Sequence, residues 1–254
     1  MAGAAAANRG PTGPFELSVG LLAVGGLMAS ILWKENVAES TNGDDTKPSI
    51  REALEVITKD KKIMLVGAVQ SLFEAAMYIF VLQWPPVISR AVGNAFGSGA
   101  HTPYGTVFSC FMASCLLGST LFGQLAQSGI ATDKSTTAML TVAALAMGSA
   151  TAAASCVAPP LAALVAAFFV FEGCVGMYFP SIGTLRSKYV PDSHRSVIMN
   201  LFGIPLNVLV VSVFLANQRL GVSGALWVST GALSLAAACM YKLRSMSKKS
   251  FADA

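Results

Sequence analysis

Phe73-Glu74, followed by Met77-Tyr78, recurs later in the chain as Phe171-Glu172, followed by Met177-Tyr178-Phe179-Pro180. Each glutamate stands near the middle of a long apolar stretch. An ionised carboxylate at the centre of a bilayer costs roughly 2.5–3.5 kcal/mol on insertion scales, so such a residue is seldom there without a role. Two of them in similar phrases indicate a polar pathway at the interface of an internal repeat, the arrangement on which secondary transporters are built.

The composition around these phrases is that of a membrane protein. Hydrophobic residues make up 54% of the chain and charged residues 12%, and the mean hydropathy is +0.62. Charged residues are about a quarter of an ordinary soluble domain. A helix needs roughly 20 apolar residues to cross a bilayer. We therefore predict an all-α membrane protein with seven transmembrane helices, over residues 16–33, 63–83, 104–127, 136–156, 160–183, 196–216 and 221–241.

The basic residues orient these helices. Of the 17 Lys and Arg, only Arg9, Arg90 and Arg219 fall on one side of the predicted membrane. Because cytoplasmic segments carry the excess of Lys and Arg, we predict a multi-pass integral membrane protein with an exterior N-terminus and a cytoplasmic C-terminus, in the plasma membrane. The net charge of +4 reflects this bias, and we expect no nucleic-acid partner.

Two three-helix repeats follow a lone first helix in the predicted organisation. Because each repeat has an odd number of helices, the second would lie inverted in the membrane. We expect the first helix of each repeat to end near proline, at Pro85-Pro86 and at Pro180. The predicted segments are an exterior tail at 1–15, a lone helix at 16–33, a cytoplasmic loop at 34–62, the repeats at 63–158 and 159–241, and a cytoplasmic tail at 242–254.

The long loop contains a helix signal. Ser49-Ile-Arg-Glu52 is a capping-box pattern. Ile50, Ala53, Leu54 and Ile57 then recur at helical spacing, which predicts a short amphipathic helix at the level of the lipid headgroups.

One polar stripe marks the first glutamate-bearing helix. Gln70, Glu74 and Tyr78 recur every fourth residue, with Ser71 beside them. We expect this face to line a cavity in which Glu74 takes up a proton or orders water. The alternative is a protonated glutamate that only joins two helices. Because burial disfavours the charged form of a carboxyl group, Glu74 and Glu172 are both candidates for proton exchange near neutral pH.

Other polar residues complete the predicted pathway. They are Tyr178, from the second glutamate phrase, and Asn200 and Asn207, which flank Pro205 in the sixth span. Arg186, Lys188 and Arg195 lie in the predicted loop between the fifth and sixth spans, where they are topology anchors or, alternatively, a cytoplasmic gate. We find no Lys or Arg in the middle of a span, so an anion-binding cation is expected from outside this chain.

Small residues predict close helix packing. Cys110, Ser114 and Gly118 recur every fourth residue on one face, and Gly173 and Gly176 flank Glu172. Such positions let a neighbouring backbone approach.

Catalytic and metal-binding motifs are missing from the sequence. We find no P-loop, no nucleophile elbow and no zincin motif. His101 and His194 fall in opposite loops, and the five cysteines lie in spans without C-x-x-C spacing. We therefore expect no enzyme activity, no cofactor and no metal.

The phrases at residues 70–85 and 111–119 resemble the seventh and eighth helices of one family, the eukaryotic molybdate-anion transporters of the major facilitator superfamily. Further likenesses cover the tenth helix and the loop after it (176–191), the eleventh (201–206) and the exit of the sixth (32–36). The resemblance implies a twelve-helix carrier, of which this chain would supply helix six, the central cytoplasmic loop and the C-terminal six-helix half, a 3+3 inverted repeat.

The resemblance also implies a function, secondary active uptake of molybdate or another oxyanion. The intramembrane glutamates add possible coupling to protons. The expected partners are the lipid bilayer, the oxyanion, protons, and either a missing N-terminal half or a second copy. One alternative is a truncated, transport-inactive half-carrier that acts as an assembly partner. The other is a seven-helix receptor, which predicts its longest loop late in the chain, whereas here that loop follows the first span.

Overall fold

The computed structural model describes residues 2–34, 49–97 and 99–252, and this part of the chain is largely helical. Residues 35–48 of the predicted loop 34–62 lie outside the described residues, as do the last two residues of the predicted tail. The described residues form two compact units, 2–34 with 103–109, and 49–97 and 99–102 with 110–252. Within the described part, six helices are long and apolar enough to cross a membrane.

The first unit contains α1 (Ala2–Arg9) and α2 (Gly13–Leu32). The Arg9 guanidinium pairs with Glu16 at 3.0 Å across the turn between them. α2 begins earlier than the predicted span, because Pro14 sits in its first turn, where the missing N–H costs nothing. The 20 residues of α2 extend about 30 Å, close to the thickness of the hydrocarbon core.

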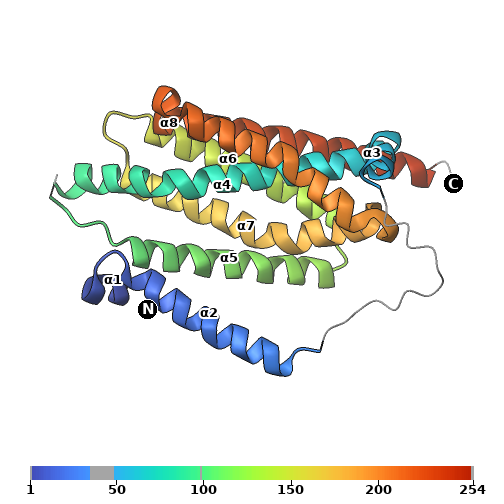
Figure 1. Ribbon diagram of the computed structural model, residues 1–254. Coiled ribbons are helices and arrows are strands. Elements are labelled where there is room, and N and C mark those ends of the chain that lie inside the picture. The colour runs from blue at the N-terminus through green and yellow to red at the C-terminus, as the bar shows by residue number, and fades with distance from the viewer. Residues whose placement is uncertain (1, 35–48, 98, 253–254) are drawn as a thin grey trace. The chain divides into compact units, whose positions relative to one another are not determined.

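The second unit is a bundle of long helices (Figure 1). Its first two helices are α3 (Ile50–Lys59) and α4 (Lys61–Phe96). The others are α5 (Tyr104–Gln127, in this unit from Cys110), α6 (Thr132–Ala154), α7 (Leu161–Tyr189), a 3-10 turn (Asp192–His194) and α8 (Arg195–Ala252).

α8 is a hairpin of two arms rather than one rod. Gly221 interrupts it with φ 64° and ψ 177°. Glycine adopts such a conformation without strain because it has no Cβ. Val213 and Ala225 lie in one cluster with Ile79, although a straight helix would hold them about 18 Å apart. The orange and red arms in Figure 1 accordingly run in opposite directions. The second arm continues as helix to Ala252, through most of the predicted cytoplasmic tail.

The prolines do not end the two glutamate-bearing helices, and this part of the sequence prediction is wrong. Pro85 and Pro86 lie inside α4, and Pro180 lies inside α7. Each proline removes one backbone hydrogen bond, a loss that membrane helices tolerate within a bundle. The helices therefore run beyond the predicted ends at 83 and 183. As a result Arg186 and Lys188 belong to α7 and not to a loop.

An aromatic core joins α4 to α7. The Phe73 ring stacks on Tyr178 with centroids 4.0 Å apart, and Phe80 meets Phe168 edge-on at 5.0 Å. Residues later in α4 thus meet residues earlier in α7, so the two helices are antiparallel. Phe111 of α5 contacts the same cluster, 5.9 Å from Phe80. The two helices that carry the glutamates are therefore direct neighbours.

The capping box at Ser49 is confirmed. The Ser49 N–H donates to Glu52 Oε2 at 3.1 Å, and the Arg51 N–H donates to Ser49 Oγ at 3.3 Å. Ala53 of α3 is fully buried against α4 and α8, whereas Leu54 is exposed. Only part of the predicted apolar face is therefore used within the bundle.

Candidate functional site

Four polar side chains meet at the α4–α7 interface. The Tyr178 hydroxyl donates to Glu74 Oε1 at 2.9 Å, and Arg186 Nη2 donates to the same oxygen at 3.2 Å. Arg186 Nε donates to Gln70 Oε1 at 3.1 Å. The side chains of Arg186 and Glu74 are 22% and 19% exposed, so the ion pair is largely sheltered but reachable. We call these residues the Glu74 cluster.

Helix geometry explains why these residues converge. Gln70 and Glu74 are one turn apart on α4 and so share a face. Tyr178 and Arg186 lie two turns apart on α7, about 12 Å along its axis. Because helical side chains lean towards the N-terminus, the long Arg186 side chain reaches back towards Tyr178 and meets it at the Glu74 carboxylate. Each helix therefore contributes two members from one face.

Arg186 is the functional candidate that sequence reasoning misplaced. We expected no cation within a span, because the fifth span was predicted to end at residue 183. α7 instead continues to Tyr189 and brings a guanidinium to Glu74. The signal was present in the sequence: Tyr178 and Arg186 have the same two-turn spacing as Gln70 and Tyr78.

The remaining members of the predicted α4 stripe lie elsewhere. The Ser71 hydroxyl donates to the Phe202 carbonyl oxygen at 2.7 Å and to that of Gly67 at 2.9 Å, which ties α4 to the first arm of α8. Tyr78 is 48% exposed and lies outside the cluster. Tyr178, from the other helix, supplies the tyrosine hydroxyl that contacts Glu74.

Glu172 does not share this cluster. It is buried on α7 and precedes Tyr178 by less than two turns, which places it about 9 Å further along the axis. Its carboxyl group lies close enough to Cys115 of α5 for an electrostatic interaction. The two glutamates are thus on neighbouring helices but at different depths.

The two asparagines lie on the surface of the unit. Asn200 is exposed, and so is Asn207. Asn207 Nδ2 donates to the Gly203 carbonyl oxygen of its own helix at 2.8 Å. The structure brings neither asparagine into the Glu74 cluster.

A second polar group joins α6, α7 and the second arm of α8. Lys188 Nζ pairs with Asp133 Oδ2 at 2.9 Å, and the Tyr189 hydroxyl contacts the same oxygen at 3.2 Å. Tyr189 Oη also lies 2.7 Å from Ser247 Oγ. Arg195 is separate, because it pairs with Asp192 in the turn before α8. The three basic residues of the predicted gate therefore lie apart: Arg186 pairs with Glu74, Lys188 with Asp133 and Arg195 with Asp192.

Replacing Asp133 by asparagine is expected to destabilise the bundle. A hydrogen bond to a charged group contributes about 1.5–3 kcal/mol. The side chain of Lys188 is 44% exposed, so solvent screening sets the effect near the lower end of that range. The thermal midpoint of the purified chain in detergent measures this loss.

Asp192→Asn is the matched control for this variant. The Asp192 side chain is 87% exposed, so its pair with Arg195 is expected to contribute little. Equal midpoints for the two variants would contradict the assigned role of Asp133.

The long apolar helices and the sheltered ion pair define an integral, multi-pass membrane protein. A model of the family described as sugar transporters with 12 transmembrane spans matches residues 3–179, and the chain belongs to this family. No solved structure matches the chain.

Curated relatives are molybdate-anion transporters. The protein from Danio rerio is 30% identical over an alignment 256 positions long, which includes 91% of this chain and 51% of the relative. The one from Xenopus tropicalis is 29% identical over 210 residues, covering 79% of this chain and 42% of the relative. The chain thus spans about half the length of the curated relatives it matches.

Proposed function

We propose that this chain is the C-terminal half of a secondary active transporter that takes up molybdate or a related oxyanion. The names of the relatives and the half-length match support this proposal. In this proposal α2 corresponds to helix six of the carrier. The helices α4, α5, α6 and α7 and the two arms of α8 each cross the membrane, and together they form a 3+3 inverted repeat. The chain then crosses the membrane seven times, with its C-terminus in the cytoplasm and the plasma membrane as its site. The antiparallel packing of α4 and α7 supports the inversion.

The observation that carries the proposal is the position of Arg186. A molybdate-like oxyanion needs donors, and a guanidinium offers a planar fork that matches two of its oxygens. Arg186 supplies such a fork inside a helix long enough to span. Tyr178 and the Gln70 amide add neutral donors within the same cluster. The site is only partly sheltered, which leaves a route for a small anion.

Competition for Arg186 supplies a mechanism for proton coupling. Glu74 holds the guanidinium through its carboxylate. A proton on Glu74 removes that charge and frees Arg186 for the oxyanion. Loss of the proton after release restores the ion pair and resets the site. Glu172 is a second candidate proton carrier, at a different depth of α7 and beside Cys115 of α5. We also propose Ser71, Tyr78, Asn200 and Asn207 as route residues outside the cluster.

Replacing Glu74 by glutamine tests this mechanism. Molybdate uptake by vesicles containing the wild-type chain is expected to rise as the outside pH falls. In Glu74→Gln the side chain is permanently neutral, so molybdate binding is expected to persist while the pH dependence of uptake disappears. Glu52→Gln, in the exposed capping box, controls for the loss of one acidic residue. An unchanged pH profile in Glu74→Gln would remove Glu74 from the coupling mechanism.

A second candidate function is a transport-inactive half-carrier that assembles with another half. The observation in its favour is the match to only 42% and 51% of the relatives' length. The mass of the purified complex and its uptake distinguish the two. Uptake by the chain, alone or joined by an N-terminal half, supports the first candidate. A stable complex with an N-terminal half or a second copy that shows no uptake supports the second.

A further inference from the structure

The second unit contains a large apolar cavity away from the Glu74 cluster. It lies between α5, α6 and α7 and has a volume of about 580 Å³, within the range of small-molecule sites. Met139 and Cys174 form part of its buried floor, while Leu117 and Val142, on its rim, are exposed. The cavity therefore opens sideways, towards the region that lipid occupies around a membrane bundle.

The crossing of two helices at one point creates this cavity. The Gly118 backbone of α5 lies directly against Gly173 of α7, and Cys115 lies against Gly176. Within α5, all of which the structure describes, only Phe111 and Gly118 are buried. α5 therefore contacts α7 closely at the crossing and leaves an apolar wedge beside α6.

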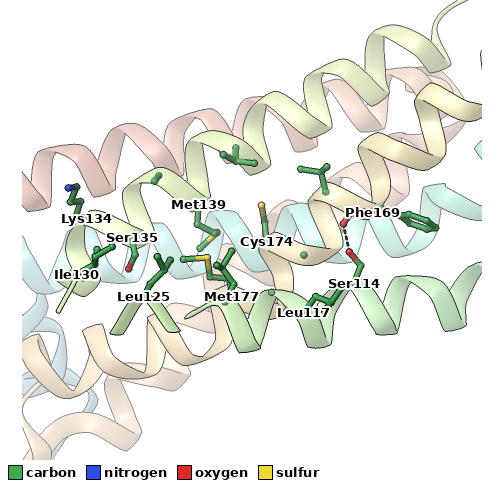
Figure 2. Close-up of a pocket in the computed structure, with 16 residues that line it drawn as sticks. Ser114, Leu117, Leu125, Ile130, Lys134, Ser135, Met139, Phe169, Cys174 and Met177 are labelled. Carbon is green, nitrogen blue, oxygen red and sulfur yellow. Dashed lines mark hydrogen bonds between the residues drawn. The ribbon is translucent and has the colours of Figure 1, made fainter. Parts of the chain in front are cut away.

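The charged residue that lines the cavity, Lys134, lies at one end of it. Figure 2 shows Lys134 and Ser135 at one end and Ser114 with Phe169 at the other. Ser114 Oγ already donates to the Phe169 carbonyl oxygen at 2.7 Å. Lys134 is exposed in the first turn of α6. Its acidic neighbour Asp133 is turned to Lys188 and Tyr189, so it does not neutralise this end.

The dimensions match one leaflet of a bilayer. The lining residues of α5 run from Ser114 to Leu125, about 16 Å of helix. The hydrocarbon core is about 30 Å thick, so each leaflet is about 15 Å. With Lys134 at headgroup level, an acyl chain would fill the cavity along this length.

We propose that the α5–α6–α7 cavity binds an anionic phospholipid, with one acyl chain in the apolar wedge and the headgroup phosphate paired with Lys134. A basic side chain at the mouth of an interhelical groove is the feature that selects an anionic headgroup. Between Lys134 with Ser135 at one end and Ser114 at the other, the wall is apolar apart from the weakly donating Cys174 thiol, so it is a poor site for the proposed oxyanion substrate. This site is independent of the transport proposal, because it shares no residue with the Glu74 cluster.

The test is lipid retention by the purified full chain, measured by native mass spectrometry with added phosphatidylglycerol or phosphatidylcholine of equal chain length. Since one Lys near an anionic surface is worth about fivefold in affinity, Lys134→Glu is expected to lower phosphatidylglycerol retention at least about fivefold. Retention of phosphatidylcholine, whose choline cation offsets its phosphate, is expected to fall less. Ala138→Phe, which fills the cavity from an exposed position, is expected to lower retention of both lipids.

Lys61→Glu is the matched control, because Lys61 is exposed at the start of α4 and lies outside the cavity. The proposal is overturned if Lys61→Glu and Lys134→Glu have equal effects, or if Ala138→Phe retains lipid as the wild type does. A dimer in place of bound lipid, lost in Ala138→Phe, would assign the cavity to a second copy of the chain and also overturn it.

Discussion

Replacing Arg186 by glutamine is expected to lower oxyanion uptake by about 100-fold or more. The substitution removes the guanidinium that contacts Glu74 and Gln70. A hydrogen bond to a charged group contributes about 1.5–3 kcal/mol, and each change of about 1.4 kcal/mol is a factor of ten in affinity. A divalent oxyanion that loses two such bonds therefore binds too weakly to be carried. The rate of molybdate uptake into vesicles measures the effect.

Three further variants separate a role in binding from a role in folding. Arg186→Lys keeps the charge but not the planar fork, so intermediate uptake is expected. The double variant Arg186→Gln with Glu74→Gln removes both charges; it is expected to recover the thermal stability lost in the single variant but not the uptake. Arg195→Gln removes an arginine whose partner Asp192 is exposed, and near-normal uptake is expected. Normal uptake in Arg186→Gln would rule out this arginine as the anion-binding residue.

Much of the fold was readable from the sequence because its signals are local. A long apolar run predicts a helix because backbone groups in lipid must form their hydrogen bonds within the segment. Every predicted span falls largely within a helix of the structure. The capping box at Ser49 depends on residues three positions apart, and it formed as predicted. The close approach expected from Gly118 and Gly176 also occurs, against the backbone of Gly173 and Cys115.

The parts that sequence reasoning missed depend on tertiary contacts. Pro85, Pro86 and Pro180 usually end a helix, but packing in the bundle carries α4 and α7 through them. Because α7 extends to Tyr189, Arg186 lies within the helix. The predicted end at residue 183 had put this arginine in a loop, away from Glu74. The partner of Glu74 could not be read from one helix, because Tyr178 and Arg186 are more than a hundred residues away in sequence.

Replacing Gly118 or Gly176 by alanine is expected to destabilise the bundle strongly. A Cβ atom at Gly118 would collide with the Gly173 carbonyl group, and one at Gly176 with that of Cys115. These obstacles are backbone atoms, which cannot rotate away as a flexible side chain does. The α5–α7 crossing therefore has to open. Overpacking costs about 1–3 kcal/mol or more, which corresponds to a fall in the thermal midpoint of roughly 2–12 °C for a protein of this size.

The same substitution at two other glycines of these helices is expected to act in the opposite direction. Gly123 of α5 and Gly183 of α7 have no atom near the position of an added Cβ. Alanine there only reduces the freedom of the unfolded backbone, which favours a helix by about 0.5–1 kcal/mol. Gly123→Ala and Gly183→Ala should therefore raise the midpoint slightly while Gly118→Ala and Gly176→Ala lower it. A uniform response of all four glycines would mean that α5 and α7 do not cross at Gly118 and Gly176, and the wedge beside that crossing would lose its structural basis.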